Sequence, residues 1–216
     1  MITIMLVDDH TVVRDGLRLL LEMQPDFRII AEANNGREAV ARASETCPDV
    51  IVMDIAMPEL NGIDALRQIR HICPATRVIV LSMHTASNYV IQALQAGADG
   101  YLLKATAGTE VIHAIRVVQS GQRYLSQMIV DTVISVYLGQ PETKTHKPPL
   151  DRLSPREREI LQLVVEGKSS AQIAEVLFIS SNTVDTYRSR LMQKLGISDL
   201  PTLVKFAIQQ GLTTLD

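Results

Sequence analysis

The chain lacks tryptophan, has few aromatic residues (4%), and contains no apolar run of the roughly 18 residues that a membrane-spanning helix requires. We therefore expect no membrane partner. A strand-like pattern begins at Ile2 with no basic segment before it, which argues against a signal peptide and favours a cytoplasmic protein. The hydrophobic content of 46% is nevertheless sufficient for packed cores.

Cysteine is also scarce. The two cysteines, Cys47 and Cys73, do not have the spacing of a metal site. We expect both to be reduced thiols that fill small apolar spaces.

Net charge is low as well, at −3, which excludes a uniformly basic nucleic-acid-binding protein. The charge is unevenly distributed, because residues 1–125 carry 11 basic and 14 acidic side chains whereas residues 151–216 carry eight of each. The C-terminal part is therefore relatively more basic.

Residues 1–122 alternate between strand-like and helical patterns. Strands are expected at 2–8, 27–33, 50–54, 77–81 and 100–103, each followed by a helical stripe, the first of which Thr11 can cap. This alternation predicts an α/β fold with a doubly wound five-stranded parallel sheet and helices on both faces.

The remainder of the chain does not show this alternation of strands and helices. Residues 123–150 are expected to hold one extra helix, at 126–139, and a polar, proline-containing linker at 140–149. Residues 151–216 have a wholly helical pattern, beginning with the helix-start signal at Ser154. Four helices are expected, and those flanking the turn at 179–182 predict a helix-turn-helix at 168–187.

Chemically active side chains lie at or directly after the ends of four of the predicted strands, namely Asp8, Asp9, Asp54, Ser82 and Lys104. In a parallel sheet these residues converge at one edge, where ligands of α/β proteins bind. Each has an ordinary alternative: Asp8 and Asp9 as helix caps, Asp54 as a strand-end acid, Lys104 as a solvated lysine. Their joint occurrence favours a shared site.

These strand ends resemble the flavodoxin-like receiver domain of bacterial response regulators. The segments LSPREREIL and GKSSAQIAEVLFISSNTVDTYRSRLMQKLGI resemble the LuxR-type helix-turn-helix. Together they place nearly the whole chain close to the NarL/FixJ family of two-component response regulators.

The resemblance implies that Asp54 accepts a phosphoryl group from a sensor histidine kinase, with Lys104 pairing with that group. It implies a Mg²⁺ (or Mn²⁺) ion held by Asp8, Asp9, Asp54 and the backbone carbonyl of Ala56. Many receivers have proline after the lysine, with a cis bond, but this chain has Ala105, and the geometry of that bond stays open.

The same resemblance makes Ser82 and Tyr101 a switch pair. After phosphorylation, the Ser82 hydroxyl would move to the phosphoryl group and Tyr101 would turn inward.

In the helix expected at 183–195, Val184, Leu191 and Leu195 face the core. Asp185 occupies a base-reading place where it could accept from cytosine N4. The alternative is an ordinary solvated helix face. The full set of expected DNA contacts is Asn182, Thr183, Asp185, Thr186, Arg188, Ser189, Arg190 and Lys194.

Leu203, Val204 and Ala207 in the last helix fit either the domain core or a dimer seam. The resemblance favours the seam, and with it a homodimer formed on phosphorylation that binds promoter DNA with two-fold repeated half-sites. RNA polymerase is a further expected partner.

The leading hypothesis is therefore a phosphorylation-controlled transcription factor. A phosphohydrolase with an aspartate nucleophile is the competing enzyme hypothesis, but no segment reads as a substrate cap, so we expect no turnover enzyme. A DNA-binding protein with a vestigial receiver is the third, against which the intact Asp8, Asp9, Asp54 and Lys104 argue.

Overall fold

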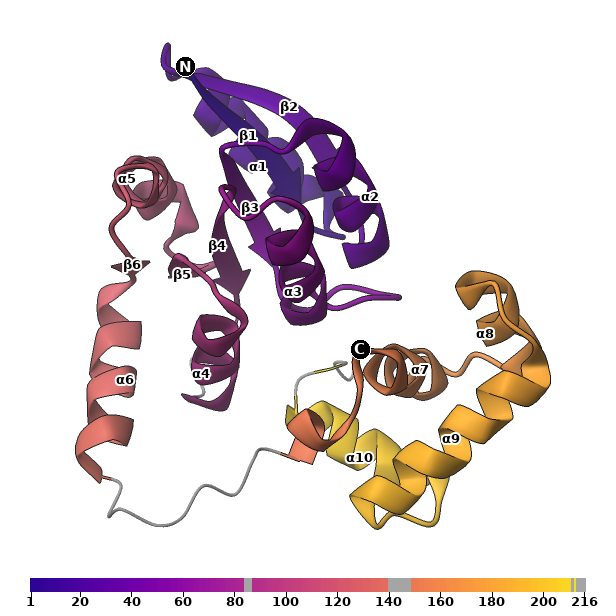
Figure 1. The fold of residues 1–216 in the computed structure, drawn as a ribbon. Helices are drawn as coiled ribbons and strands as arrows, with labels where there is room; N and C mark the ends of the chain where they lie inside the picture. The colour runs from indigo at the N-terminus through magenta and orange to yellow at the C-terminus, as the bar shows by residue number, and fades with distance from the viewer. Residues whose placement is uncertain (84–86, 140–148, 211, 213–216) are drawn as a thin grey trace. The chain divides into compact units, whose positions relative to one another are not determined.

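The computed structural model describes residues 1–83, 87–139, 149–210 and 212 of the chain (Figure 1). It divides into two compact units, Met1–Pro141 and Glu142–Asp216. The division falls within the predicted linker, whose residues 140–148 lie outside the described part.

A six-stranded, wholly parallel sheet forms the centre of the first unit, in the order β2-β1-β3-β4-β5-β6. Five of its strands were predicted; the sixth was missed because two residues are too few to show an alternating pattern. The strands are β1 Ile2–Val7, β2 Phe27–Ala33, β3 Val50–Asp54, β4 Arg77–Ser82, β5 Gly100–Leu103 and β6 Tyr124–Leu125.

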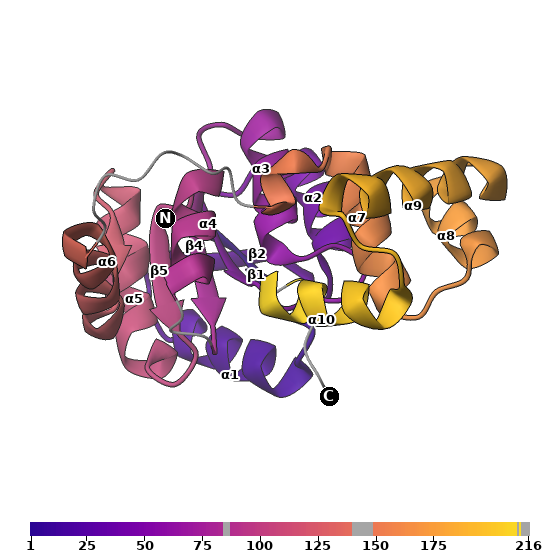
Figure 2. The ribbon, with the colours of Figure 1, turned by 90° about the horizontal axis from the view of Figure 1, so that it is seen from below.

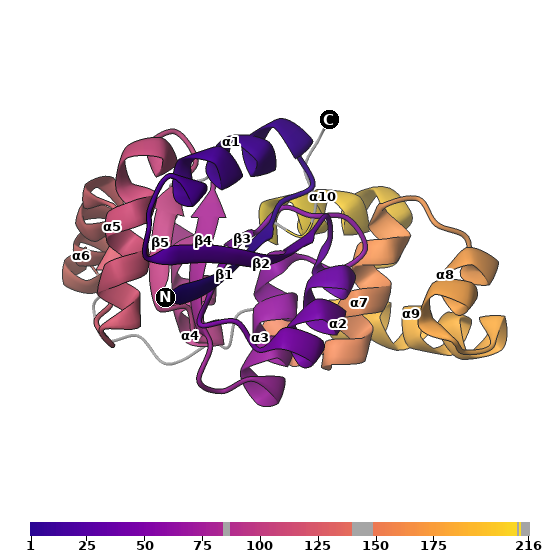
Figure 3. The ribbon, with the colours of Figure 1, turned by 90° about the horizontal axis from the view of Figure 1, so that it is seen from above.

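Helices cover both faces of the sheet, as the alternation of patterns predicted. Views from below and above show α1 on one side and α2 and α3 on the other (Figures 2 and 3). The helices are α1 Thr11–Glu22, α2 Gly36–Thr46, α3 Gly62–Ile72, α4 Ser87–Ala96, α5 Ala107–Gln119 and α6 Gln127–Gly139.

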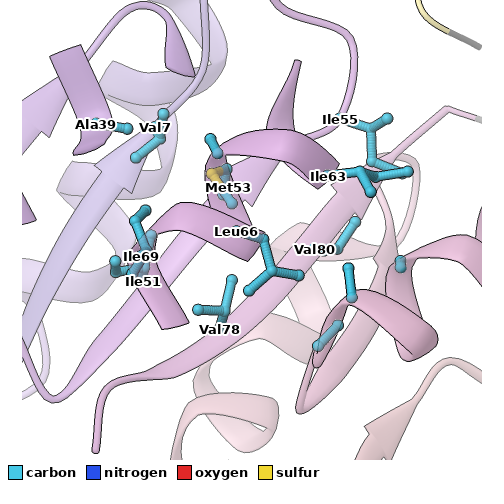
Figure 4. Packing of buried hydrophobic residues seen from close by; sticks show 14 of the residues in the cluster. Val7, Ala39, Ile51, Met53, Ile55, Ile63, Leu66, Ile69, Val78 and Val80 are labelled. Atoms are coloured by element: carbon cyan, nitrogen blue, oxygen red, sulfur yellow. The ribbon is translucent and has the colours of Figure 1, made fainter. Parts of the chain in front are cut away.

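Alternate residues of the strands feed two separate cores. Val50 and Val52 of β3 pack with α1 and α5, whereas Ile51 and Met53 pack with α2, α3 and α4 (Figure 4). Because every residue of β3 is buried, the strand reads as a continuous apolar run that ends at the one charged residue, Asp54.

Thr11 does not cap α1, contrary to expectation. His10 occupies the N-cap position, and Thr11 is already the first helical residue. The physical reason is that the Asp8 carboxylate accepts a hydrogen bond from the backbone N–H of His10 at 2.9 Å, which closes the turn one residue earlier.

The expectation of two reduced cysteines is wrong in this structure, which contains a Cys47–Cys73 disulfide. Cys47 caps the C-terminus of α2 and Cys73 caps that of α3, and their Cα atoms lie 5.6 Å apart. Successive right-handed crossovers bring these two helix ends together, a proximity that a separation of 26 residues does not reveal.

Reduction of this disulfide is expected to lower the free energy of unfolding by about 2–4 kcal/mol, since the bond restricts the unfolded chain. Thermal unfolding with and without dithiothreitol measures the effect, and a Cys47→Ser variant should not respond to the reductant. Equal melting temperatures of the wild type in both conditions would contradict the expectation.

The second unit is wholly helical: η1 Pro149–Arg152, α7 Pro155–Val165, α8 Ser170–Leu177, α9 Ser181–Leu195 and α10 Leu200–Gln210. Ser154 and Glu157 form the predicted capping box at the start of α7. The helix α9 begins earlier than expected, because the Ser180 hydroxyl caps it by accepting from the Thr183 N–H. None of the helices in the described ranges is both long and apolar enough to cross a membrane.

Candidate functional site

Three strand-end side chains meet at one edge of the sheet. Asp54 is the last residue of β3, and Asp8 directly follows β1, its neighbour in the sheet. Lys104 follows β5, on the far side of β4, and reaches across to both acids. Asp8 and Asp54 are almost completely buried, with 1% and 3% exposure.

The ammonium group of Lys104 lies between the two carboxylates. Its Nζ atom is 2.7 Å from Asp54 Oδ2 and 2.7 Å from Asp8 Oδ2. Two buried carboxylates that contact the same ammonium group need a positive counter-charge, and Lys104 supplies it. The structure therefore brings together the predicted acids and the predicted lysine.

Burial raises the pKa of Asp54 to about 6, because a charged carboxylate is poorly solvated there. The Lys104 ammonium and a 3.3 Å hydrogen bond from the Ala56 N–H oppose this rise, and the charge of Asp8 adds to it. Burial alone would lower the pKa of Lys104, but its contacts with Asp54 and Asp8 raise it overall.

The donor set at this edge fits a hard divalent cation. Ligand atoms of Asp8, Asp9, His10 and Asp54 all lie within 4.8 Å of one another. The buried Oδ2 of Asp8 accepts no well-aligned hydrogen bond from any described residue, despite its ion pair with Lys104. Carboxylate oxygens are the ligands that Mg²⁺ prefers. The N–H of Ala56 contacts Asp54, whereas the role of its carbonyl oxygen as a metal ligand stays a prediction.

His10 is a member of this cluster that the sequence analysis missed. Its Nδ1 lies 2.7 Å from Asp9 Oδ1 and 3.1 Å from Asp8 Oδ1. The signal in the sequence was its position directly after the two acids, where the chain turns from β1 into α1.

The loop after Asp54 is held by a close backbone approach at Gly62. A Cβ atom at this position would lie 2.0 Å from the carbonyl oxygen of Asp54, so only glycine fits without a shift. The Gly62 N–H also donates to the carbonyl of Ile55 at 2.9 Å. This packing fixes the start of α3 against the acidic site.

Ser82 and Tyr101 also lie where the sequence predicted, at and near the ends of β4 and β5. Both are buried, and their side chains are hydrogen-bonded to each other. Burial raises the pKa of Tyr101 to about 12. The ring packs in the same core as Val90 of α4 and Ile129 of α6. The structure holds no cis peptide bond among its described residues, so the Lys104–Ala105 bond is trans.

The outer face of α9 carries most of the predicted DNA contacts, while Val184 and Leu191 are buried beneath it as expected. Half-buried Thr183 and Arg188 have partners within the domain: Thr183 bonds to Ser180, and Arg188 to Ser170. The exposed positions are Asn182, Asp185, Thr186, Ser189, Arg190 and Lys194.

Lys194 has a structural partner that its sequence position did not reveal. Its Nζ lies 2.7 Å from Glu157 Oε2, the same carboxylate oxygen that accepts from the Ser154 N–H in the cap of α7. The ion pair ties α9 to α7 and leaves Lys194 less available for a phosphate than predicted.

The assignment of Leu203 and Ala207 to a dimer seam is contradicted by their burial. They are 1% and 0% exposed and belong to the core of the helical unit, where they pack with residues of α7 and α9. Only Val204, which is half-buried, retains surface for a partner. Apolar character alone could not separate core from seam.

Two family comparisons cover most of the chain. Residues 4–116 match the response regulator receiver domain, and residues 151–207 match the bacterial regulatory proteins of the luxR family. The first lies on the sheet and its acidic edge, and the second lies on the helical unit that contains α8 and α9.

Curated relatives match over nearly their whole length. The chain is 38% identical to the response regulator UvrY of Escherichia coli (strain K12), over 98% of this chain and 96% of UvrY. It is 36% identical to the transcriptional regulatory protein DegU of Brevibacillus brevis, over 97% of this chain and 94% of DegU.

Solved structures of response regulators are also similar to this chain. A two-component response regulator of the LuxR family from Aurantimonas sp. SI85-9A1 aligns with a TM-score of 0.62 at 38% identity, covering 64% of this chain and 99% of that one. RcsB of Salmonella enterica serovar Typhimurium, bound to promoter DNA, aligns with a TM-score of 0.61 over 98% of this chain and 99% of that one. At 24% identity, RcsB supports the fold alone.

Proposed function

Because this chain belongs to the two-component response regulators that join a receiver domain to a LuxR-type DNA-binding domain, we propose that a phosphoryl group on Asp54 controls its binding to promoter DNA. The relatives are transcriptional regulators, not enzymes, and the chain is a DNA-binding regulator of this kind. The observation that carries the proposal is the buried Asp54 carboxylate held beside Lys104.

The proposed chemistry is transfer from a phosphohistidine of a sensor histidine kinase. An oxygen of Asp54 attacks phosphorus, a P–O bond forms, and the P–N bond breaks as the imidazole leaves. Lys104 then pairs with the new phosphoryl group. Asp8, Asp9 and Asp54, with the Ala56 carbonyl, would hold Mg²⁺ or Mn²⁺, which when bound supplies positive charge beside the phosphoryl oxygens.

The hydrogen bond between Ser82 and Tyr101 supports a role for this pair in the response. If the Ser82 hydroxyl turns towards a phosphoryl oxygen, the Tyr101 hydroxyl loses its hydrogen bond with Ser82. Because Tyr101 packs in one core with α4 and α6, the surface formed by these helices responds. The helix α6 runs alongside α4 and leads towards the second unit along the chain (Figure 1).

For the output, we propose that the phosphorylated chain forms a homodimer whose two α9 helices read two-fold repeated half-sites. Structures of RcsB as dimers on DNA, and in a promoter complex with a phosphomimetic, support this arrangement for a protein of the same fold. RNA polymerase is a further proposed partner at the promoter.

Phosphoryl uptake tests the proposal. The full chain is incubated with a small acyl phosphate and Mg²⁺, and its intact mass is measured. The wild type should gain one phosphoryl group, located on Asp54 by peptide mapping, and the Asp54→Asn variant should gain none. A gain of equal extent in both proteins would refute the assignment.

Asp185→Lys is expected to change the preferred DNA sequence. An ammonium group cannot accept a hydrogen bond from cytosine N4 but can donate to guanine, so base preference at one position should change by about 1–3 kcal/mol. A DNA selection with the wild type and the variant measures this. The matched substitution Glu175→Lys, at an exposed position of α8, makes the same change of charge and should leave the preferred site unchanged.

A further inference from the structure

The hydroxyl of Ser170 joins two side chains of the recognition helix. Ser170 is the first residue of α8. Its Oγ donates to Asp185 Oδ1 at 2.6 Å and accepts from Arg188 Nη1 at 3.0 Å. The contact therefore links the start of one helix of the helix-turn-helix to the outer part of the other.

Capping of α8 does not require this hydroxyl. The neighbouring Ser169 is the N-cap, its side chain accepts from the Gln172 N–H, and the Gln172 side chain accepts from the Ser169 N–H. With the cap complete, the side chain of Ser170 is directed entirely to α9. The two adjacent serines thus perform separate tasks that substitution can distinguish.

The direction of the two hydrogen bonds is fixed by their chemistry. An arginine can only donate and an ionised aspartate can only accept, so the single Ser170 proton goes to Asp185 while a lone pair receives Arg188. Asp185 and Arg188 are three residues apart and lie on the same side of α9. The result is a chain from guanidinium to hydroxyl to carboxylate.

This hydrogen-bonded series of three side chains reduces two free-energy costs that an acid has on a surface that binds DNA. An exposed aspartate side chain rotates freely, and ordering it on binding costs free energy. It is also repelled by DNA phosphates. The hydrogen bond from Ser170 limits the rotation of the Asp185 carboxylate before DNA binds. The second hydrogen bond of Ser170 holds the positive charge of Arg188 near that carboxylate. Among the described residues, no hydrogen bond reaches Asp185 Oδ2, which is available for a partner.

We propose that Ser170 is a positioning residue for sequence recognition, which holds Asp185 so that its carboxylate accepts from the amino group of a cytosine in the major groove. Arg188 then acts mainly through Ser170 rather than as an independent phosphate contact. The inference rests on the proposed function, in which α9 reads promoter DNA.

A DNA selection followed by affinity measurements tests this with the full chain, treated with a small acyl phosphate and Mg²⁺. Ser170→Ala should lower the preference for cytosine at one position of the site about tenfold, within the range of a good base contact. Ser170→Thr keeps the hydroxyl and should restore the preference. Ser169→Ala, the matched control, should weaken the cap of α8 and leave base preference unchanged.

Two further measurements separate positioning from other roles. The salt dependence of binding should be the same for Ser170→Ala and the wild type, because no phosphate contact is removed. In a double-mutant cycle, Ser170→Ala should have little effect once Asp185→Asn is present, since the hydroxyl acts through that carboxylate.

Distinct results would overturn the inference. An unchanged cytosine preference in Ser170→Ala would do so, as would equal losses in Ser170→Ala and Ser169→Ala, which would indicate a purely structural role. If the wild type itself selects no sequence, the proposed function fails and the inference fails with it. If the wild type selects a site that Ser170→Ala selects equally well, only the inference fails.

Discussion

Asp54→Asn is expected to abolish phosphoryl uptake and, at the same time, to raise the melting temperature of the metal-free protein at pH 8. The loss of uptake follows from removal of the nucleophilic carboxylate. The gain in stability follows from its burial, which raises the pKa of Asp54 from 3.8 to about 6. A site arranged for chemistry is thus expected to reduce the stability of the fold.

The pH dependence gives this prediction its sign. Below pH 3.8 the carboxyl is protonated in both the folded and unfolded chains, and the substitution should have little effect. Between about pH 3.8 and 6 the unfolded chain releases the Asp54 proton while the folded wild type keeps it, so the relative stability of the wild type falls, and above about pH 6 the loss stays constant. At pH 8 the difference reaches at most about 3 kcal/mol, from a pKa shift of roughly two units.

Thermal unfolding at pH 4 and pH 8 measures the effect, with Asp131→Asn as the control because Asp131 is exposed on α6. Asp131→Asn should match the wild type at both values of pH. A destabilised Asp54→Asn protein at pH 8, or a stability gain that does not depend on pH, would contradict this account of the acidic site.

Lys104→Met is expected to have the opposite effect and to destabilise the receiver unit by about 3–5 kcal/mol at pH 8. The lysine is the counter-charge for Asp8 and Asp54, with Nζ 2.7 Å from each. Its removal leaves two buried carboxylates facing each other, and breaking such a buried pair costs this amount. Methionine preserves much of the buried length of the side chain, so the loss of charge dominates.

Two conditions should reduce the loss of stability in Lys104→Met. At pH 5 the buried carboxyl of Asp54, whose pKa is raised to about 6, should retain a proton in Lys104→Met, which lowers the repulsion and the loss of stability. Added Mg²⁺ should restore stability at pH 8 by supplying the missing positive charge. Thermal unfolding of the full chain provides the readout, with exposed Lys205→Met as control. If Lys104→Met melts like the wild type at pH 8 without metal, the ion pair does not stabilise the fold.

The sequence predicted those features that depend on local pattern or on strand ends. The run Val50–Asp54 identified a strand buried on both faces, and parallel topology then required Asp8, Asp54 and Lys104 to converge. The cap of α7 at Ser154 was likewise readable, because the pairing with Glu157 lies within four residues. In each case a general rule, either the spacing of a capping box or the convergence of parallel strand ends, predicts from sequence position which residues lie close together.

Features that depend on tertiary contact could not be read in this way. The Cys47–Cys73 disulfide joins the ends of two helices, and the pairing of Lys194 with Glu157 joins two others. Ala207 is an apolar residue on an amphipathic helix, and only packing shows that it faces the core. The short strand β6 has too few residues for any periodic signal.

The most direct test of the account is the affinity of the full chain for its selected promoter DNA before and after treatment with a small acyl phosphate and Mg²⁺. The account predicts that the affinity of the wild type rises about 5- to 150-fold, the usual range of coupling between two sites, and that the affinity of Asp54→Asn does not change. A wild-type chain that carries the phosphoryl group and binds DNA no differently, or an equal rise in Asp54→Asn, would contradict it.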